Sequence, residues 1–288
     1  MKKGATEPLR LDDAIIVDEI GIESGGYGLY RLRSLYQPIF ERRGKNLHMV
    51  AVDGTVAPFV AGEVAPPEMF RIAITEDDRD FVARMSIALA LRNQHNLGVD
   101  GLDLIVSARF DETDPGAPGE RVAFMAGEIA DREPDLEFEV GQVFCALAHT
   151  TIPEGLKLAR LAQQCRELGL RMAIGDFGAG HWTDEQIGIL DPDIVRIDGG
   201  WFHQVCRDAT TARLFDSVVA RLRDRRSKVL VSGIASELQF GIALRAGAHL
   251  FQGDHLARPG LAGVAIDHDP LPIVQRLGDA RKIVPLFG

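Results

Sequence analysis

The chain has 288 residues, of which 46% are hydrophobic and 26% are charged, and its 32 Lys and Arg against 42 Asp and Glu give a net charge of −10. This composition excludes a disordered or fibrous chain, and the acidic balance argues against binding to nucleic acid. Three widely spaced cysteines without a CxxC pair indicate neither a disulfide framework nor a structural zinc site. Without a secretory signal or a membrane-length apolar run, we expect a cytoplasmic protein that contacts no membrane.

Strand-like runs and helix-like segments alternate over most of the chain. Residues 1–30 mix charges, glycines and short apolar pieces, and we interpret them as an N-terminal extension with little structure of its own. Beyond them, β-branched runs precede segments of helical period, which is typical of βα units around a parallel sheet. The predicted helices are residues 75–93, 154–167, 210–225 and 236–245, and the predicted strands are residues 36–40, 48–52, 102–106, 136–140, 172–174, 194–197, 228–231 and 248–251.

Eight strands with helices between most of them favour one closed (β/α)8 barrel over an open sheet, and we assign residues 31–288 to that single domain. In such a barrel the chemistry lies at the carboxyl ends of the strands. Polar residues, among them Asp53, Ser107 and Ser232, follow several predicted strands there. Taken one at a time, such residues are as typical of strand ends and helix caps as of an active site.

Four fragments, in this order, carry a resemblance to a known family: YQPI at residues 36–39, GDFGAG at 175–180, DIVRID at 193–198, and FQG at 251–253 with Arg258-Pro259 beyond. Their order and spacing resemble the EAL domain, a family of cyclic di-GMP phosphodiesterases, over roughly residues 30–262. The resemblance implies an α/β fold, a modified TIM-like (β/α)8 barrel whose first strand runs antiparallel to its neighbours. It also implies hydrolysis of one phosphodiester bond of cyclic di-GMP by two Mg²⁺ or Mn²⁺ ions and a metal-activated water.

The resemblance assigns metal-site roles to a few acidic residues that the chain keeps. The Glu of the E-A-L signature falls on Asp53, and one of two paired Asp residues is kept as Asp176. The first Glu of an E-x-T-E segment falls on Glu139, and the Asp of the strand near residue 197 is kept as Asp198. We regard these four positions as a vestigial metal site.

Other positions of the family's site are substituted. The catalytic Lys falls on Arg196, and Arg does not exchange freely with Lys at a tight site. The remaining substitutions are Ala57 for an Arg that grips the ligand phosphate, Ile105 for a metal-binding Asn, Gln142 for the second Glu of E-x-T-E, Gly175 for the other paired Asp, and Ser232 and Ala235 for two Glu of an E-G-V-E segment.

The three carboxylates of Asp53, Glu139 and Asp176 suffice for a single weakly bound Mg²⁺ at most and are too few for two ions. The sequence therefore predicts no cofactor and no enzyme, because losing one charge-stabilising group commonly costs about 10²–10³ in rate. We expect a catalytically inactive regulator in cyclic di-GMP signalling that binds an unidentified protein.

Two alternative functions stay open, and so does the oligomeric state. The first alternative is a non-catalytic cyclic di-GMP receptor, and the second is a weak metal-dependent phosphodiesterase. The resemblance also makes homodimerisation an expectation. The positions that resemble ligand-facing ones in the family are Gln37, Arg196, Gln252 and Arg258.

Overall fold

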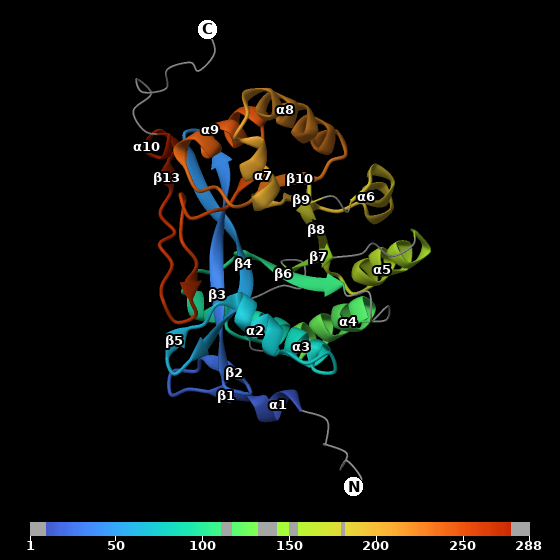
Figure 1. Ribbon diagram of the computed structural model, residues 1–288, viewed down its shortest axis with the longest axis vertical. Helices are drawn as coiled ribbons and strands as arrows, with labels where there is room; N and C mark the ends of the chain where they lie inside the picture. Colours follow the sequence, from blue (N-terminus) through green and yellow to red (C-terminus); the bar gives the residue numbers. More distant parts are fainter. Residues whose placement is uncertain (1–9, 111–116, 132–142, 150–154, 180–181, 278–288) are drawn as a thin grey trace.

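The computed structural model describes residues 10–110, 117–131, 143–149, 155–179 and 182–277, and its centre is a closed barrel (Figure 1). In barrel order, the strands are β3 (Tyr30–Arg43), β11 (Leu250–Phe251), β10 (Lys228–Val231), β9 (Ile194–Ile197), β8 (Arg171–Phe177), β7 (Val143–His149), β6 (Asp103–Phe110) and β4 (Asn46–Val60). Pairing of β4 with β3 closes the ring. β3 is antiparallel to both neighbours, and the other neighbouring pairs are parallel. The predicted fold is therefore confirmed.

Helices surround the barrel and connect its strands (Figure 1). All four predicted helices are present, and the last of them shows how a helix is capped at both ends: the side chain of Ser236 accepts the Gln239 N–H, and Gly247 ends the same helix at a φ of 82°. The helices are α2 (Pro67–Ala73), α3 (Arg79–Arg92), the 3₁₀ turn η1 (Gln94–Leu97), α4 (Ala117–Ala130), α5 (Gly155–Glu167), α6 (Asp184–Leu190), α7 (Gly199–Val205), α8 (Ala209–Asp224) and α9 (Glu237–Ala246).

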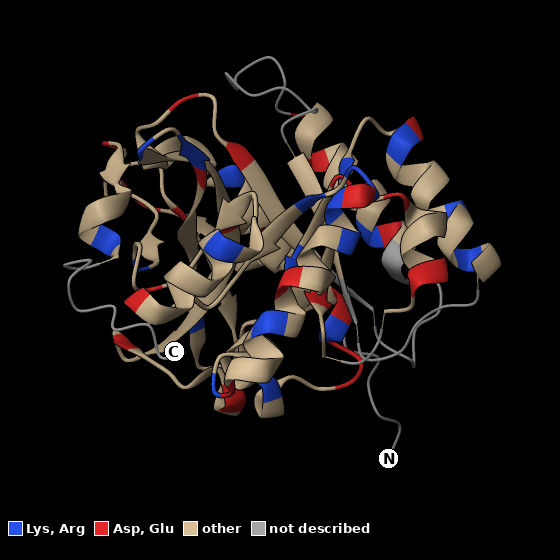
Figure 2. Cartoon of the chain, turned by 90° about the horizontal axis from the view of Figure 1, so that it is seen from above, with Lys and Arg blue, Asp and Glu red and all other residues tan. Residues whose placement is uncertain are grey.

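Charged side chains lie mostly on the helices and loops outside the barrel. Figure 2 shows Lys and Arg interspersed with Asp and Glu, with no face of a single sign in that view. Many of these side chains pair locally, as Arg84 does with Asp80 at 2.6 Å. Over the described ranges, the helices are all too short or too polar to cross a lipid bilayer.

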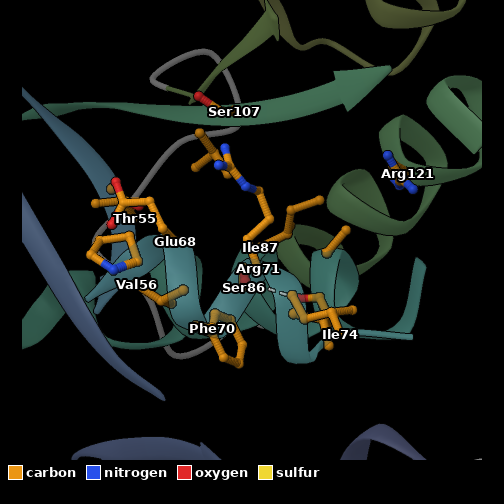
Figure 3. Close-up of a pocket in the computed structure, with 15 residues that line it drawn as sticks. Thr55, Val56, Glu68, Phe70, Arg71, Ile74, Ser86, Ile87, Ser107 and Arg121 are labelled. Carbon is orange, nitrogen blue, oxygen red and sulfur yellow. Dashed lines mark hydrogen bonds between the residues drawn. The ribbon is translucent and has the colours of Figure 1, made fainter. Parts of the chain in front are cut away.

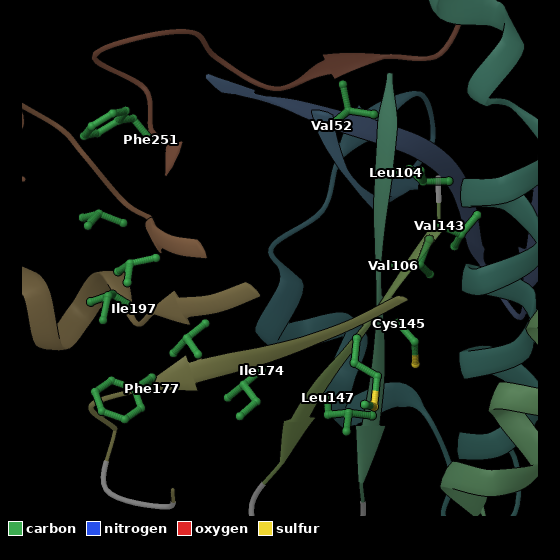
Figure 4. Close-up of a cluster of buried hydrophobic side chains, with 14 of the residues drawn as sticks. Val52, Leu104, Val106, Val143, Cys145, Leu147, Ile174, Phe177, Ile197 and Phe251 are labelled. Atoms are coloured by element: carbon green, nitrogen blue, oxygen red, sulfur yellow. The ribbon is translucent and has the colours of Figure 1, made fainter. Parts of the chain in front are cut away.

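The side chains of the barrel strands alternate between two buried clusters, as the pleat of a strand requires. One set, including Val52, Leu104 and Ile174, belongs to the large cluster that also contains the inner faces of the helices (Figure 4). The other set fills the barrel interior with hydrocarbon, which restricts polar groups to the two ends of the barrel. The interior residues are Ile39, Ala51, Ile105, Phe144, Ala146, Ala173, Ile194, Leu230 and Leu250.

One barrel strand lies where the sequence analysis predicted none. β7 pairs in parallel with both β6 and β8, and its residues from Val143 to Leu147 are buried. The strand predicted at residues 136–140 lies outside the described residues. The missed signal is the apolar run VFCAL at residues 143–147, which resembles the other strands. The carboxyl end of this barrel strand therefore comes at His149, well after the residues first assigned to it.

Residues within the segment interpreted as an extension also form regular structure. α1 (Leu11–Ala14) leads into β1 (Ile15–Val17), which pairs with β2 (Glu23–Tyr27), and β2 pairs with β3. The expectation of little structure therefore does not describe residues 11–27, whereas the boundary near residue 30 stays a prediction. The remaining elements are β5 (Glu63–Val64), β12 (Gly260–Leu261), β13 (Leu271–Pro272) and α10 (Ile273–Arg276).

A fully buried amide attaches these N-terminal strands to the barrel. Asn93, at the end of α3, donates to the carbonyl oxygen of Glu23 at 2.8 Å and to the hydroxyl of Ser34 at 2.7 Å. Its Oδ1 accepts the Glu23 N–H at 2.8 Å. The same side chain therefore joins β2, β3 and α3.

Replacing Asn93→Ala should lower the free energy of unfolding by about 2–4 kcal/mol, because it removes three hydrogen bonds and leaves buried groups without partners. Urea denaturation measures the change. Gln163→Ala, which removes only an exposed bond to Glu167 in the same helix, is the control and should cost less than about 0.5 kcal/mol. Equal effects of the two substitutions would contradict the assigned role.

A second prediction concerns His249, whose Nδ1 accepts the Val229 N–H at 3.0 Å. Burial, reinforced by the charges of Arg223 and Lys228, lowers the pKa of His249 below its ordinary 6.5. Because the unfolded chain then binds more protons below about pH 6.5, stability should fall as the pH drops from about 7 to 5. His249→Asn retains an acceptor that does not titrate, so denaturation across this pH range should show a shallower slope. An unchanged slope would rule out His249 as its source.

Candidate functional site

The polar residues predicted for the barrel mouth lie two positions beyond the inner hydrocarbon cluster on their strands. Asp53 is two residues from Ala51, and Arg196 is two residues from Ile194. Alternate residues of a strand share a face, so these side chains point inward at the carboxyl ends. The structure brings this set to the mouth: Gln37, Asp53, Gly175, Arg196, Ser232 and Gln252.

An ion pair spans the mouth. Nη1 of Arg196 lies 2.7 Å from Oδ2 of Asp53, and the two side chains are 13% and 19% exposed. The buried Gln252 donates to the same oxygen at 3.2 Å. Since a guanidinium keeps its charge at all ordinary pH values, the carboxylate of Asp53 has a permanent cationic partner. The two positions that resemble a metal ligand and a catalytic Lys thus bind each other.

Gln37 has a partner of its own. Its Nε2 donates to Oδ1 of Asp254 at 3.0 Å, so the amide is turned toward the loop that follows β11. Asp254 has no predicted role, although its place directly after Gln252-Gly253 in the sequence is a usable signal. Arg258 lies farther along that loop with an exposed side chain.

Two further predicted residues satisfy local hydrogen bonds. A carboxylate oxygen of Asp198 accepts the Trp201 N–H at 2.6 Å and caps α7. The hydroxyl of Ser232 donates to the carbonyl oxygen of Ile197 at 2.6 Å. Ile105, in place of a metal-binding Asn, is 1% exposed within the inner cluster and stands opposite Asp53 in the β4–β6 register. These side chains stabilise the ends of the strands.

The chain bulges where the paired Asp residues of the family would lie. The register of β8 and β9 shifts between Ile174 and Phe177, and Asp176 has a φ of +56°. The indole of Trp182 donates to the carbonyl oxygen of Gly175 at 2.8 Å. Asp176 is half-buried, and Gly175 supplies no side chain. The bulge therefore presents a single carboxylate.

The other predicted positions are not drawn together at the mouth. Ala57 is 9% exposed and pairs with Arg33 of β3, whereas Ala235 is exposed and its N–H donates to Gln239. Glu139 and Gln142 lie outside the described residues. Both precede β7 in the chain.

A cavity of about 330 Å³ opens beside the mouth, between α2, α3 and the ends of β4 and β6 (Figure 3). Phe70, Ile74 and Ile87 contribute to its apolar lining, and Thr55 and Ser107 contribute hydroxyls. Figure 3 shows Arg71 extending from α2 toward Ser107. No motif pointed to Arg71 in the sequence, because neither its spacing nor its neighbours distinguish it from a solvent-exposed helix residue.

Together, the barrel and its polar mouth define a (β/α)8 domain in whose ring β3 runs antiparallel to its neighbours. The family model of the EAL domain matches residues 29–259, and the chain belongs to this family. The resemblance drawn from the sequence is confirmed at this level.

Individual relatives match over shorter stretches. The chain is 26% identical over 100 residues to the probable cyclic di-GMP phosphodiesterase PdeD of Escherichia coli K12, which covers 35% of this chain and 19% of that protein. It is 27% identical over 99 residues to the bifunctional diguanylate cyclase/cyclic di-GMP phosphodiesterase MucR of Pseudomonas aeruginosa, covering 34% and 14%. The matched segment thus spans under a fifth of either relative.

Solved structures share the fold over most of the chain. A standalone EAL protein from Vibrio cholerae O395, bound to cyclic di-GMP, aligns with a TM-score of 0.68 at 19% identity, covering 84% of this chain and 98% of that one. The YkuI protein of Bacillus subtilis, in complex with cyclic di-GMP and calcium, aligns with a TM-score of 0.67 at 19% identity, covering 85% and 59%.

The described residues do not fit a pair of divalent cations. Hard cations need several oxygen ligands, but Asp53 is bound to Arg196, Ile105 offers hydrocarbon and Gly175 has no side chain. Over the part of the chain that the structure describes, no three His, Cys, Asp or Glu side chains are grouped so as to hold a metal ion.

The ion pair at the mouth predicts a measurable coupling. Arg196→Met should lower the free energy of unfolding by about 2–3 kcal/mol, because it leaves the carboxylate of Asp53 largely buried without its cation. Adding Asp53→Asn should restore part of that loss in a double-mutant cycle. Arg221→Met, which breaks an exposed pair with Asp184, should cost less than about 1 kcal/mol. Additive effects of the two mouth substitutions would show that the pair is not coupled.

Proposed function

We propose that this chain is an EAL-domain signalling protein that does not hydrolyse cyclic di-GMP and acts through a protein partner. The observation that carries the proposal is the ion pair of Asp53 and Arg196, which occupies the carboxylate and the cation at two positions of the family's catalytic site. A metal ion would have to displace a guanidinium held at 2.7 Å before it gained that ligand.

The neighbouring substitutions support the same conclusion. Ile105 belongs to the barrel's hydrocarbon core, and Asp198 caps a helix. Phosphoryl transfer needs preorganised cationic stabilisation and a positioned nucleophile. The carboxylate at position 53 is paired, the family's Asn at position 105 is Ile and its Asp at position 175 is Gly, so the mouth lacks ligands for the metal ions that would provide both.

A second candidate function is that of a non-catalytic receptor for cyclic di-GMP. The cavity beside the mouth favours it, because apolar walls and two hydroxyls suit a nucleobase, and Arg71 adds a positive charge at the rim. Two of the solved structures with the same fold hold cyclic di-GMP. Arg196 supports this candidate less, because its charge is already paired.

Incubating the purified chain with cyclic di-GMP and Mn²⁺ tests the main proposal. We expect no linear dinucleotide by chromatography above a reaction without protein, and no difference between the chain and its Asp53→Ala variant. An active EAL-domain phosphodiesterase serves as the positive control. Product that forms with the chain and disappears with Asp53→Ala would overturn the proposal.

Calorimetric titration of cyclic di-GMP in EDTA separates the two candidate functions. Metal-independent binding that weakens at least about tenfold in Arg71→Ala, but not in the exposed control Arg207→Ala, would establish the receptor. Absence of binding heat would exclude the receptor and leave the protein–protein function.

A further inference from the structure

The first described strand, β1, has one edge that no other described strand pairs with. Among the described strands, β1 pairs only with β2 and ends the sheet order. It lies at the opposite end of the molecule from α10, beside β2 and α1 (Figure 1). An open edge presents backbone N–H and C=O groups that can pair with another chain.

The hydrogen-bond pattern identifies which backbone groups face that edge. The Asp18 N–H donates to the carbonyl oxygen of Ile22 at 3.0 Å in the turn after β1. Bonded and non-bonded pairs alternate along an antiparallel ladder, so Ile16 bonds to β2 and its neighbours face outward. The Ile15 N–H is used by Leu11 within α1. The N–H and C=O of Val17 and the C=O of Ile15 therefore point to the open edge.

Apolar side chains are exposed beside these groups. The side chains of Ile16, Val17 and Ile20 are 53%, 58% and 73% exposed. Large apolar side chains at an unpaired strand edge promote association with another chain. Ile15, by contrast, contacts the cluster that includes Met85 and Leu89. Within β1, Ile15 therefore packs against the protein, whereas Ile16 and Val17 are exposed to solvent.

Acidic residues flank this apolar edge on both sides. Asp12 and Asp13 precede the strand, Asp18 and Glu19 follow it, and all four are exposed. If two copies of the chain paired edge to edge in antiparallel fashion, the acids before one strand would face the acids after the other, and like charges would repel. Charge complementarity favours a basic partner instead.

We propose that β1 is a docking strand for an extended segment of a partner protein, in which alternating apolar residues are flanked by Lys or Arg. The segment adds to the sheet by strand addition: its backbone pairs with Ile15 and Val17, its apolar side chains cover Ile16 and Val17, and its basic ends meet the acids. The inference rests on the proposed function, because it specifies the chemistry of the protein partner.

Two substitutions and their controls test the surface in the full chain. Val17→Pro removes the outward N–H without breaking the β1–β2 ladder, and an edge strand accepts proline; Val17→Thr is its control and keeps the N–H. Asp13→Lys with Glu19→Lys reverses the flanking charge. Its control, Glu185→Lys with Glu237→Lys, makes the same change in net charge on α6 and α9.

The probe is a fluorescein-labelled peptide of alternating Val and Thr with Lys at both ends, and fluorescence anisotropy measures its binding. We expect binding that weakens with salt and weakens at least about tenfold in Val17→Pro and in the β1 charge reversal, but not in either control. Should Val17→Pro unfold by circular dichroism, the charge reversal still decides.

Three results would overturn the docking strand: no binding of the basic peptide, equal binding of a peptide with Glu ends, or full binding by the folded β1 variants. Each differs from failure of the proposed function, which is release of linear dinucleotide from cyclic di-GMP. If the chain neither hydrolyses cyclic di-GMP nor binds the peptide, the proposed function stands and only the docking strand is overturned.

Discussion

The contact of Asp53 with Arg196 is the constraint on which the chemistry of the barrel mouth depends. It joins β4 to β9 across the opening, and Gln252 adds a hydrogen bond from the end of β11. Both charged side chains are mostly buried, where an ion pair is less screened than at the surface. The carboxylate therefore neutralises a protein cation, and the net charge of these two positions is zero.

The neighbouring positions follow the same physical logic. A mouth built for cations holds several carboxylates close together, which repel one another when no metal is bound. In this chain Ile105 extends the hydrocarbon core, the hydroxyl of Ser232 satisfies a strand carbonyl and Asp198 caps a helix. Each substitution or reassignment gives its position a structural role.

The barrel itself was predictable because alternating apolar strands and capped helices are local patterns. β7 was missed because the prediction favoured residues 136–140, where apolar residues alternate with Glu, over the apolar run that begins at Val143. β1 and β2 were missed because a glycine-rich strand gains its stability from β3 and from Asn93, far away in the chain. At the mouth, the sequence identified Asp53 and Arg196 separately. The two residues are 143 positions apart in the sequence, and their contact depends on closure of the barrel.

The long strand β3 places the two surfaces of functional interest on one element. Gln37 lies at the mouth, and four residues earlier Arg33 pairs with Ser24 of β2, which in turn pairs with Ile16 of β1. At about 3.3 Å per residue, some 13 Å of strand separates the mouth from this small sheet. Because β3 runs antiparallel to its neighbours, its amino-terminal part lies at the end of the barrel where their carboxyl ends lie: it continues past β11 and stays paired with β4 as far as Phe59. The reversed direction of this one strand therefore puts β1 at the same end of the barrel as the mouth.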